Sequence, residues 1–205
     1  MSVTIILLDY LRHEHTQRVK DVNLNNAGHP FELIVVDRNG ISAAINEGIH
    51  QAEGDVVTMA NDILMPDNWL FNFMRYRTQI ENSAMIGIHT VEGLPAAIEC
   101  NGLKIWPCCP FGNVLITKEA IEKVGYFNLD LDPYSTNDAD YYYRCEIAGM
   151  LSYYIPGKAE HIGHDVGDQT DYRKMKDECL ANGKGKQWLE YYKKTGNIYL
   201  GYKQD

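Results

Sequence analysis

Positive charge is scarce in this chain, and no run of lysine or arginine stands out. The 205 residues include 19 Lys and Arg against 28 Asp and Glu, for a net charge of −9. Proteins that bind nucleic acid generally carry a basic surface that neutralises phosphates, so we expect no nucleic-acid partner. The charge does not exclude a phosphate-bearing ligand, because a divalent metal can supply the positive charge.

A disulfide framework and a long apolar run are also missing. The five cysteines are odd in number and irregularly spaced, unlike a disulfide scaffold or a zinc site: Cys100, Cys108, Cys109, Cys145 and Cys179. We therefore expect thiols in a reducing, cytoplasmic compartment. The opening apolar run, SVTIILL, lacks a basic leader and is too short to span a bilayer. It is interpreted as a buried strand, and we expect no integral membrane segment.

Apolar runs alternate with segments of helical spacing in the first half of the chain. A strand, a helix and a second strand form a crossover unit, which favours parallel pairing. The order βαβαβα followed by a mixed second half predicts one α/β/α sandwich with a mostly parallel central sheet. Strands are expected at 3–8, 31–36, 55–60, 84–89, 112–116 and 151–155, and helices at 12–25, 42–52, 66–79, 118–124, 137–148 and 171–192. Residues 90–111 are expected to form a hairpin or a loop.

Aspartates follow three of the expected strands. Asp9, Asp37 and Asp62 each come at a strand end. If these strands are neighbours, the carboxylates converge at the carboxyl edge of the sheet, where open α/β sheets bind ligands. The alternative is that each aspartate simply begins a turn, which is the commoner role for a single one.

Two further groups of residues suggest chemistry. On the helix 137–148, Asp140 and Arg144 are four residues apart and can pair on one face, whereas Asp138 points elsewhere. One acid would then be structural and the other would face a ligand, although both could equally complement the helix dipole. His161, with His164 and Asp165 after it, follows a strand and is either a metal ligand or an ordinary surface histidine.

These pieces together resemble the family 2 glycosyltransferases and related enzymes of the GT-A nucleotide-diphospho-sugar transferase fold. ELIVVD resembles the strand whose terminal aspartate contacts the nucleotide base, and RNGISAAINEGIHQAEGDVVTMANDILMPDNWL follows the family's run into its acidic metal motif. FGNVLITKEAIEKVGYFN resembles the acceptor-side strand and helix. YSTNDADYYYRCEIAGM resembles the motif of the general base, and AEHIGH resembles the late histidine of the metal site.

The resemblance implies a function and a set of site residues. It implies transfer of a sugar from a nucleotide-diphospho-sugar, with UDP-sugars favoured, to a carbohydrate or other hydroxyl acceptor, with inversion. Asp138 would be the general base, and Mn²⁺ or Mg²⁺ would be the cofactor. Asp62 and His161 would bind the metal. The nucleotide would contact Asp9, Asp37, Asn39, Asn46 and Asn61. The transferase domain would cover 1–168, with 169–205 as a helical tail packed on it.

The chain also differs from the family pattern. Ala60 replaces the first acid of the metal motif, and Asn137 replaces the glutamate before the base. The segment between Asp37 and Gly40 is much shorter than is usual in the family. These differences motivate an alternative, a non-catalytic nucleotide-sugar or carbohydrate-binding relic of the same fold. A third hypothesis, a sugar-phosphate nucleotidyltransferase, is disfavoured because DYLRHEHTQ lacks the glycines of a phosphate loop.

Overall fold

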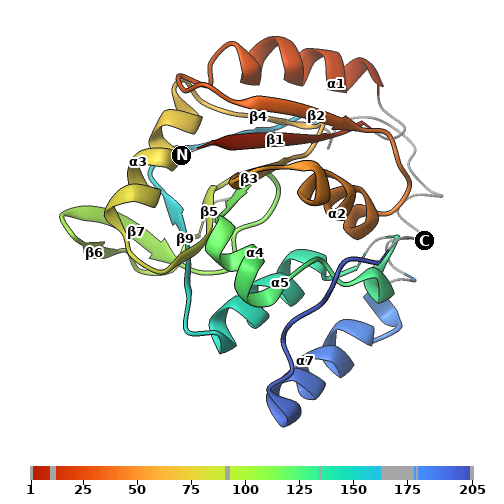
Figure 1. Cartoon of the computed structure of the whole chain (residues 1–205). Helices are drawn as coiled ribbons and strands as arrows, with labels where there is room; N and C mark the ends of the chain where they lie inside the picture. Colours follow the sequence, from red (N-terminus) through yellow and green to blue (C-terminus); the bar gives the residue numbers. More distant parts are fainter. Residues whose placement is uncertain are drawn as a thin grey trace.

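An eight-stranded sheet runs through the centre of the protein, with helices on both sides (Figure 1). The computed structural model describes residues 2–9, 13–90, 93–133, 135–162, 178 and 180–203. The strands are β1 (Val3–Leu8), β2 (Glu32–Val36), β3 (Asp55–Met59), β4 (Ile63–Leu64), β5 (Ser83–Ile88), β6 (Ile98–Cys100), β7 (Leu103–Pro107), β8 (Val114–Ile116), β9 (Leu151–Ile155) and β10 (Glu160–His161). The helical segments are α1 (His13–Val19), its π-helical continuation η1 (Lys20–Leu24), α2 (Ile41–Gln51), α3 (Trp69–Gln79), α4 (Lys118–Val124), the 3₁₀ turn η2 (Leu129–Leu131), α5 (Asn137–Ile147) and α7 (Lys184–Thr195).

Most strands of the sheet point in one direction. The order is β2-β1-β3-β8-β5-β9-β7-β6. β1 pairs in parallel with both β2 and β3, and β5 pairs in parallel with β9. β8 lies antiparallel between β3 and β5, so that β2, β1, β3, β5 and β9 all run the same way. The prediction of a mostly parallel α/β sandwich is confirmed, and the carboxyl ends of these five strands meet at one edge.

The sheet is covered on both faces, as the continuous apolar run of β1 predicts. Val3, Ile5 and Leu7 pack in one apolar cluster with α3, whereas Ile6 faces a second cluster with α2, α4 and α5. Alternate side chains of one strand thus enter two separate cores, because successive residues of a strand point to opposite faces. Within segment 90–111, β6 and β7 form a hairpin, one of the two forms expected.

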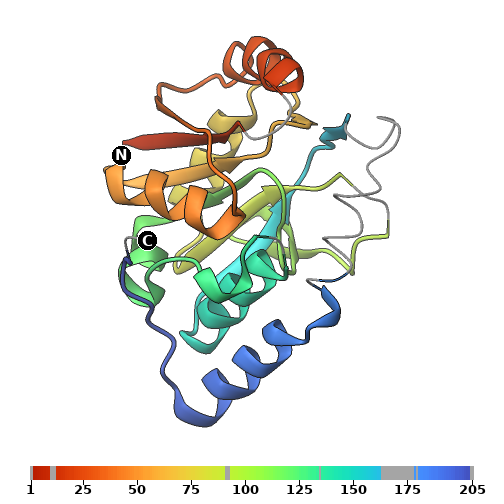
Figure 2. The same cartoon turned by 90° about the vertical axis from the view of Figure 1, so that its right-hand side faces the viewer.

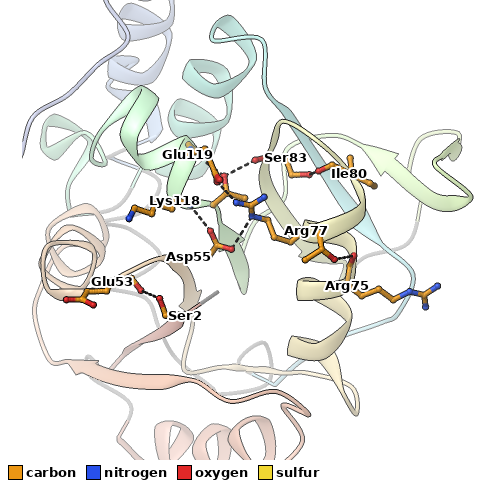
Figure 3. Close-up of polar contacts among 12 residues, drawn as sticks. Ser2, Glu53, Asp55, Arg75, Arg77, Ile80, Ser83, Lys118 and Glu119 are labelled. Atoms are coloured by element: carbon orange, nitrogen blue, oxygen red, sulfur yellow. Dashed lines mark hydrogen bonds and ion pairs between the residues drawn. The ribbon is translucent and has the colours of Figure 1, made fainter.

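A buried acid fixes two helices to the start of β3. The Asp55 carboxylate is 3% exposed, accepts a hydrogen bond from the Lys118 amide at 2.8 Å and pairs with the Arg77 guanidinium at 3.1 Å. Arg77 also binds Glu119 of α4 (Figure 3). The network ties α3 and α4 to the amino end of β3. It is therefore structural and lies at the opposite end of the strand from the candidate site.

The C-terminal part packs against α5 and α4. Figure 2 shows α7 lying alongside α5. The chain then returns to α4, where Tyr126 and Val124 exchange backbone hydrogen bonds with Leu200 at 2.8 and 3.1 Å. The expectation of one helix over 171–192 is wrong in its described part, because Gly183 adopts a φ of +70° and α7 begins only after it. No described helix is both long and apolar enough for a membrane span.

Candidate functional site

The acidic edge expected from the sequence is present. β1 is the central member of the parallel trio, with Leu8 opposite Val36 of β2 and Leu7 opposite Met59 of β3. The Asp9 amide donates to the Val36 carbonyl at 2.9 Å, which holds the ends of β1 and β2 together. Asp37, Asp9 and the pair Asn61-Asp62 therefore leave adjacent strands at the same edge. The three strands are thus neighbours, which was the condition for their terminal aspartates to share one edge.

A hydroxyl of α1 links two of these residues. Thr16 donates its hydroxyl proton to Asp9 Oδ1 at 2.6 Å, and Asn61 Nδ2 donates to Thr16 Oγ1 at 3.2 Å. Asp9 and Asn61 are half-buried. Thr16 of α1 thus holds the side chains of Asp9 and Asn61 in place. Together they form a preorganised polar surface at the carboxyl ends of β1 and β3.

Asp62 and His161 come together through a small second sheet. β4 and β10 pair antiparallel with His161 opposite Ile63, and the Ile162 amide donates to the Asp62 carbonyl at 2.8 Å. This pairing brings His161 Nε2 to 3.7 Å from Asp62 Oδ2, with both side chains partly exposed. The two residues predicted as metal ligands therefore lie side by side, although they are far apart in the sequence.

The Asp62–His161 pair brings together two side chains of the types that bind divalent metals. One carboxylate oxygen and one imidazole nitrogen are ligands that Mn²⁺ and Mg²⁺ accept. Within the described ranges, no group of three or more His, Cys, Asp or Glu side chains is arranged to hold a metal ion. Two protein ligands suit a cation whose remaining positions are filled by water and by phosphates. His164 and Asp165 lie outside the described residues.

The segment that joins β2 to α2 presents two of the predicted nucleotide contacts. Asp37 and Asn39 are exposed at the edge of the sheet. Arg38 between them is half-buried and pairs with Glu47 of α2 at 3.5 Å. Asp37 and Asn39 thus stand on the same edge as Asp9 and are open to a ligand there.

Asn46 requires a correction. Its side chain is 3% exposed, and both amide atoms bind the backbone of Phe127, with the Nδ2–O distance 2.9 Å and the N–Oδ1 distance 2.7 Å. Both polar groups of the side chain are therefore used to join α2 to the segment after α4. This geometry gives Asn46 a structural role and removes it from the predicted nucleotide contacts.

The two acids of α5 have different surroundings, as their spacing predicts. Asp140 pairs with Arg144 at 2.9 Å, both side chains are at most 1% exposed, and the Tyr192 hydroxyl donates to Asp140 at 3.0 Å. Asp138 is half-buried. Burial, and to a smaller degree the charge of Asp138, raises the pKa of the Cys109 thiol. Asp140 is therefore structural, whereas Asp138 is outside the buried pair with Arg144.

Two polar residues of this region escaped the sequence analysis. Asp132 accepts hydrogen bonds from the Ser42 and Ala43 amides at 2.7 and 2.9 Å and so caps the start of α2. Asn113 is 2% exposed, accepts from the Ala60 amide at 2.8 Å and donates to the Ile63 carbonyl at 3.3 Å. Asn113 thus fixes the turn that carries Asp62. Neither residue lies in a sequence pattern that indicates its distant partner.

Comparison by sequence finds no relative. No model of a known protein family matches the chain, and no curated protein matches it.

Comparison by structure finds several similar proteins. The mannosyltransferase PcManGT from Pyrobaculum calidifontis, solved with GDP-Man and Mn²⁺, has a TM-score of 0.59 at 14% identity over 80% of this chain and 58% of that one. TarS of S. aureus has a TM-score of 0.59 at 14% identity, covering 77% of this chain and 35% of that one. A mutant of Drosophila beta1,4-galactosyltransferase 7 with manganese, UDP-Gal and xylobiose has a TM-score of 0.55 at 11% identity over 86% and 79% of the two chains.

The similarity extends across most of this chain, but the chain spans only about half, or less, of the first two of these proteins. At such low identity the comparison establishes the fold and leaves activity to be argued from the residues. The central sheet, its helices and these solved structures together show that the chain has the GT-A-like fold of the nucleotide-sugar glycosyltransferases.

Proposed function

We propose that the chain is a metal-dependent glycosyltransferase that moves a sugar from a nucleotide-diphospho-sugar to a hydroxyl acceptor. The observation that carries the proposal is the Asp62–His161 pair, 3.7 Å apart at the same sheet edge as Asp9 and Asp37. Asp138 supplies a further carboxylate that, unlike Asp140, is not in the buried pair with Arg144. The fold supports the same assignment, because the similar structures are glycosyltransferases.

The donor would bind along the acidic edge. Asp37 is proposed to accept a hydrogen bond from the base, with Asn39 beside it, and Asp9 and Asn61 would contact the rest of the nucleotide. A carboxylate that pairs with an imide N–H favours uracil, so UDP-sugars are the first donors to test. The solved relatives differ here, since one contains GDP-Man and another UDP-Gal.

Asp62 and His161 would hold Mn²⁺ or Mg²⁺ together with the diphosphate. Such a cation, when bound, offsets the negative charge that develops on the leaving diphosphate. Asp138 would take the proton from the acceptor hydroxyl, which requires an ionised carboxylate within hydrogen-bond reach. Direct attack by that hydroxyl on the anomeric carbon would invert its configuration.

Donor turnover tests the proposal. Release of nucleoside diphosphate is measured for a panel of nucleotide sugars with Mn²⁺, with Mg²⁺ and with EDTA. We expect release with one class of donor and loss of release in EDTA. Asp62→Asn should raise the Mn²⁺ concentration required, because one charged ligand is lost. Asp67→Asn is the matched control, since Asp67 is exposed on the following turn. If no donor released nucleoside diphosphate, the proposal that the chain is an enzyme would be refuted.

The binding relic remains the alternative, and one observation favours it. Only residues 38–40 separate Asp37 from α2, and the Asp132 carboxylate occupies the first amides of that helix. A donor phosphate therefore has no access to those amides. A relic would show Mn²⁺-dependent binding of a nucleotide sugar by calorimetry with no release of diphosphate, which separates the two functions.

We also propose a cytoplasmic location and a carbohydrate acceptor. The described cysteines are free thiols, as a reducing compartment requires: Cys100, Cys108, Cys109 and Cys145. Xylobiose in one of the similar structures supports a sugar as acceptor. The proposed division at 168/169 falls outside the described residues.

A further inference from the structure

An exposed aromatic ring is held rigidly in the segment between β7 and β8. Phe111 is 41% exposed. Its ring packs edge-on against Tyr154 with the centroids 6.1 Å apart, and its amide donates to the Tyr154 hydroxyl at 3.2 Å. Tyr154 itself is 2% exposed. Phe111 thus presents an aromatic ring to solvent from a backbone position that the buried Tyr154 holds.

The sheet is shaped to receive this segment. A Cβ atom at Gly87 of β5 would lie 2.8 Å from Pro110 Cβ and 2.9 Å from Tyr154 Cε1. Glycine at this position therefore allows Pro110 and the Tyr154 ring to pack closely on the sheet. The ring of His89 stands next to Tyr154 at 6.2 Å and next to Trp106 at 6.3 Å. Phe111 is the exposed end of this row of rings.

The same row lies beside the proposed base. α5 leads directly into β9 and packs on it, and the Met150 amide binds the Cys145 carbonyl at 2.9 Å in the tight turn between them. The first turn of α5, with Asp138, is therefore at the carboxyl end of β9, where Tyr154 lies. The segment of Phe111, which contacts Tyr154, and the first turn of α5 are therefore at the same end of β9.

We propose that Phe111 is the platform on which a carbohydrate acceptor places one face of its ring, next to Asp138. This inference rests on the proposed function and names the residue that holds the proposed carbohydrate acceptor. A pyranose has C–H groups on its faces and hydroxyls around its rim, so an aromatic face can hold the ring while a rim hydroxyl reaches the carboxylate. The described segment 108–116 exposes no other large apolar side chain, which suits one sugar ring better than a lipid chain.

Direct binding tests the platform without any need for turnover. Saturation-transfer NMR is run with methyl glycosides of glucose, galactose, mannose and xylose on the wild type and on Phe111→Ala, Phe111→Trp and Phe71→Ala. Phe71 is the control because it is 51% exposed on α3, which packs on the other face of the sheet. We expect at least one glycoside to receive saturation on its ring C–H groups, Phe111→Ala to abolish it, and Phe111→Trp and Phe71→Ala to retain it. No glycoside signal in the wild type, or equal signals in wild type and Phe111→Ala, would overturn the inference.

Kinetics separate this inference from the proposed function. With a donor that the enzyme turns over, Phe111→Ala should raise the KM for a glycoside acceptor about tenfold, the scale of one aromatic contact, and change kcat less. Phe71→Ala should leave both constants unchanged. An unchanged acceptor KM in Phe111→Ala, with normal release of diphosphate by the wild type, refutes the platform and leaves the transferase intact. Absence of release from every donor refutes the transferase, and the NMR result then decides on the platform alone.

Discussion

At the scale of single residues, two aspartates of one helix turn have different surroundings. Asp140 lies in a buried pair with Arg144, whose guanidinium also donates to the Val124 carbonyl at 2.8 Å and stacks over the Tyr141 ring at 4.9 Å. Asp138 is half-buried and lies outside that pair. The Arg144 pair fixes α5 and thereby the direction in which Asp138 points.

Loss of Arg144 should be costly. Arg144→Met leaves the Asp140 carboxylate buried without its cation, and we expect the free energy of unfolding to fall by about 3–5 kcal/mol. Lys118→Met is the control, because Lys118 and Glu122 form an exposed pair at 4.0 Å, worth at most about 1 kcal/mol. Urea unfolding followed by circular dichroism measures both. Equal stability of the two variants would contradict a structural role for Arg144.

At this scale the sequence predicted what local geometry determines. The spacing of four residues predicted that Asp140 and Arg144 can pair, and the pair is confirmed. The separate direction of Asp138 stays a prediction. Asn46 shows the limit. Its partner is the backbone of Phe127, a contact made only when α2 packs next to the segment after α4. No local pattern reveals such a partner, so Asn46 was wrongly assigned to the nucleotide.

At the scale of elements, the start of α2 depends on a distant loop. Gly40 has a φ of +97°, and a Cβ atom there would lie 2.9 Å from Asp132 Oδ2. The Asp132 carboxylate binds two amides of α2, and Asn137 Nδ2 donates to Ser42 Oγ at 2.5 Å. The segment with Asp37 and Asn39, which is proposed to contact the nucleotide base, is thereby joined to Asn137, the first residue of α5. Asn137 directly precedes Asp138, the proposed general base.

Gly40→Ala should disturb this junction. We expect it to lower the free energy of unfolding by about 1 kcal/mol more than Gly102→Ala does, because both have positive φ but only Gly40 is crowded. Gly102 has a φ of +73°, and a Cβ atom added there would meet nothing within 4 Å. Thermal and urea unfolding of the two variants give the comparison. If Gly40→Ala lowered the free energy of unfolding less than Gly102→Ala does, the Asp132 side chain would be able to move away from the added Cβ atom without an energetic penalty.

Most elements follow from local signals in the sequence. Thr117 caps α4 with its hydroxyl 3.2 Å from the Ala120 amide, and Gly125 ends that helix, as the sequence indicates. The strands at 3–8 and 151–155 also have the expected bounds. The β4–β10 pairing was not foreseen, because each strand has two residues and shows no alternation to recognise.

At the scale of the whole molecule, the C-terminal segment closes over α5. Tyr192 of α7 is fully buried, donates its hydroxyl to Asp140 at 3.0 Å and accepts from Asn128 Nδ2 at 3.2 Å. Leu200 then binds the backbone at the end of α4. The C-terminal segment therefore completes the polar cluster that holds the helix of the proposed base.

Tyr192→Phe should weaken this closure. Removal of the hydroxyl takes a donor from a buried carboxylate, and we expect the free energy of unfolding to fall by about 1.5 kcal/mol. Tyr191→Phe is the control, because Tyr191 is 41% exposed and its hydroxyl contacts only Asn197 among the described residues. We expect a change within about 0.5 kcal/mol for it. Similar losses in both would mean that the Tyr192 hydroxyl contributes nothing beyond packing.

The fold as a whole was predictable because its motifs come in order along the chain, and the solved structures confirm the GT-A-like fold. Strand order placed Asp9, Asp37 and Asp62 at one edge, and tertiary packing added Asp132 and Asn113. Such contacts arise between surfaces that meet only in the folded chain. The contacts that Asp132 and Asn113 make with residues distant in the sequence are therefore known only from the structure.

The most direct test of the proposed transferase compares Asp138→Asn with Asp130→Asn, an exposed acid of η2. Donor affinity is measured by calorimetry with Mn²⁺, and the rate of transfer is measured by diphosphate release in the presence of acceptor. If Asp138 is the base, Asp138→Asn lowers kcat by about 10²–10⁴-fold with unchanged donor affinity, and Asp130→Asn changes neither. Transfer by Asp138→Asn at the wild-type rate would contradict the assignment of the base and the mechanism built on it.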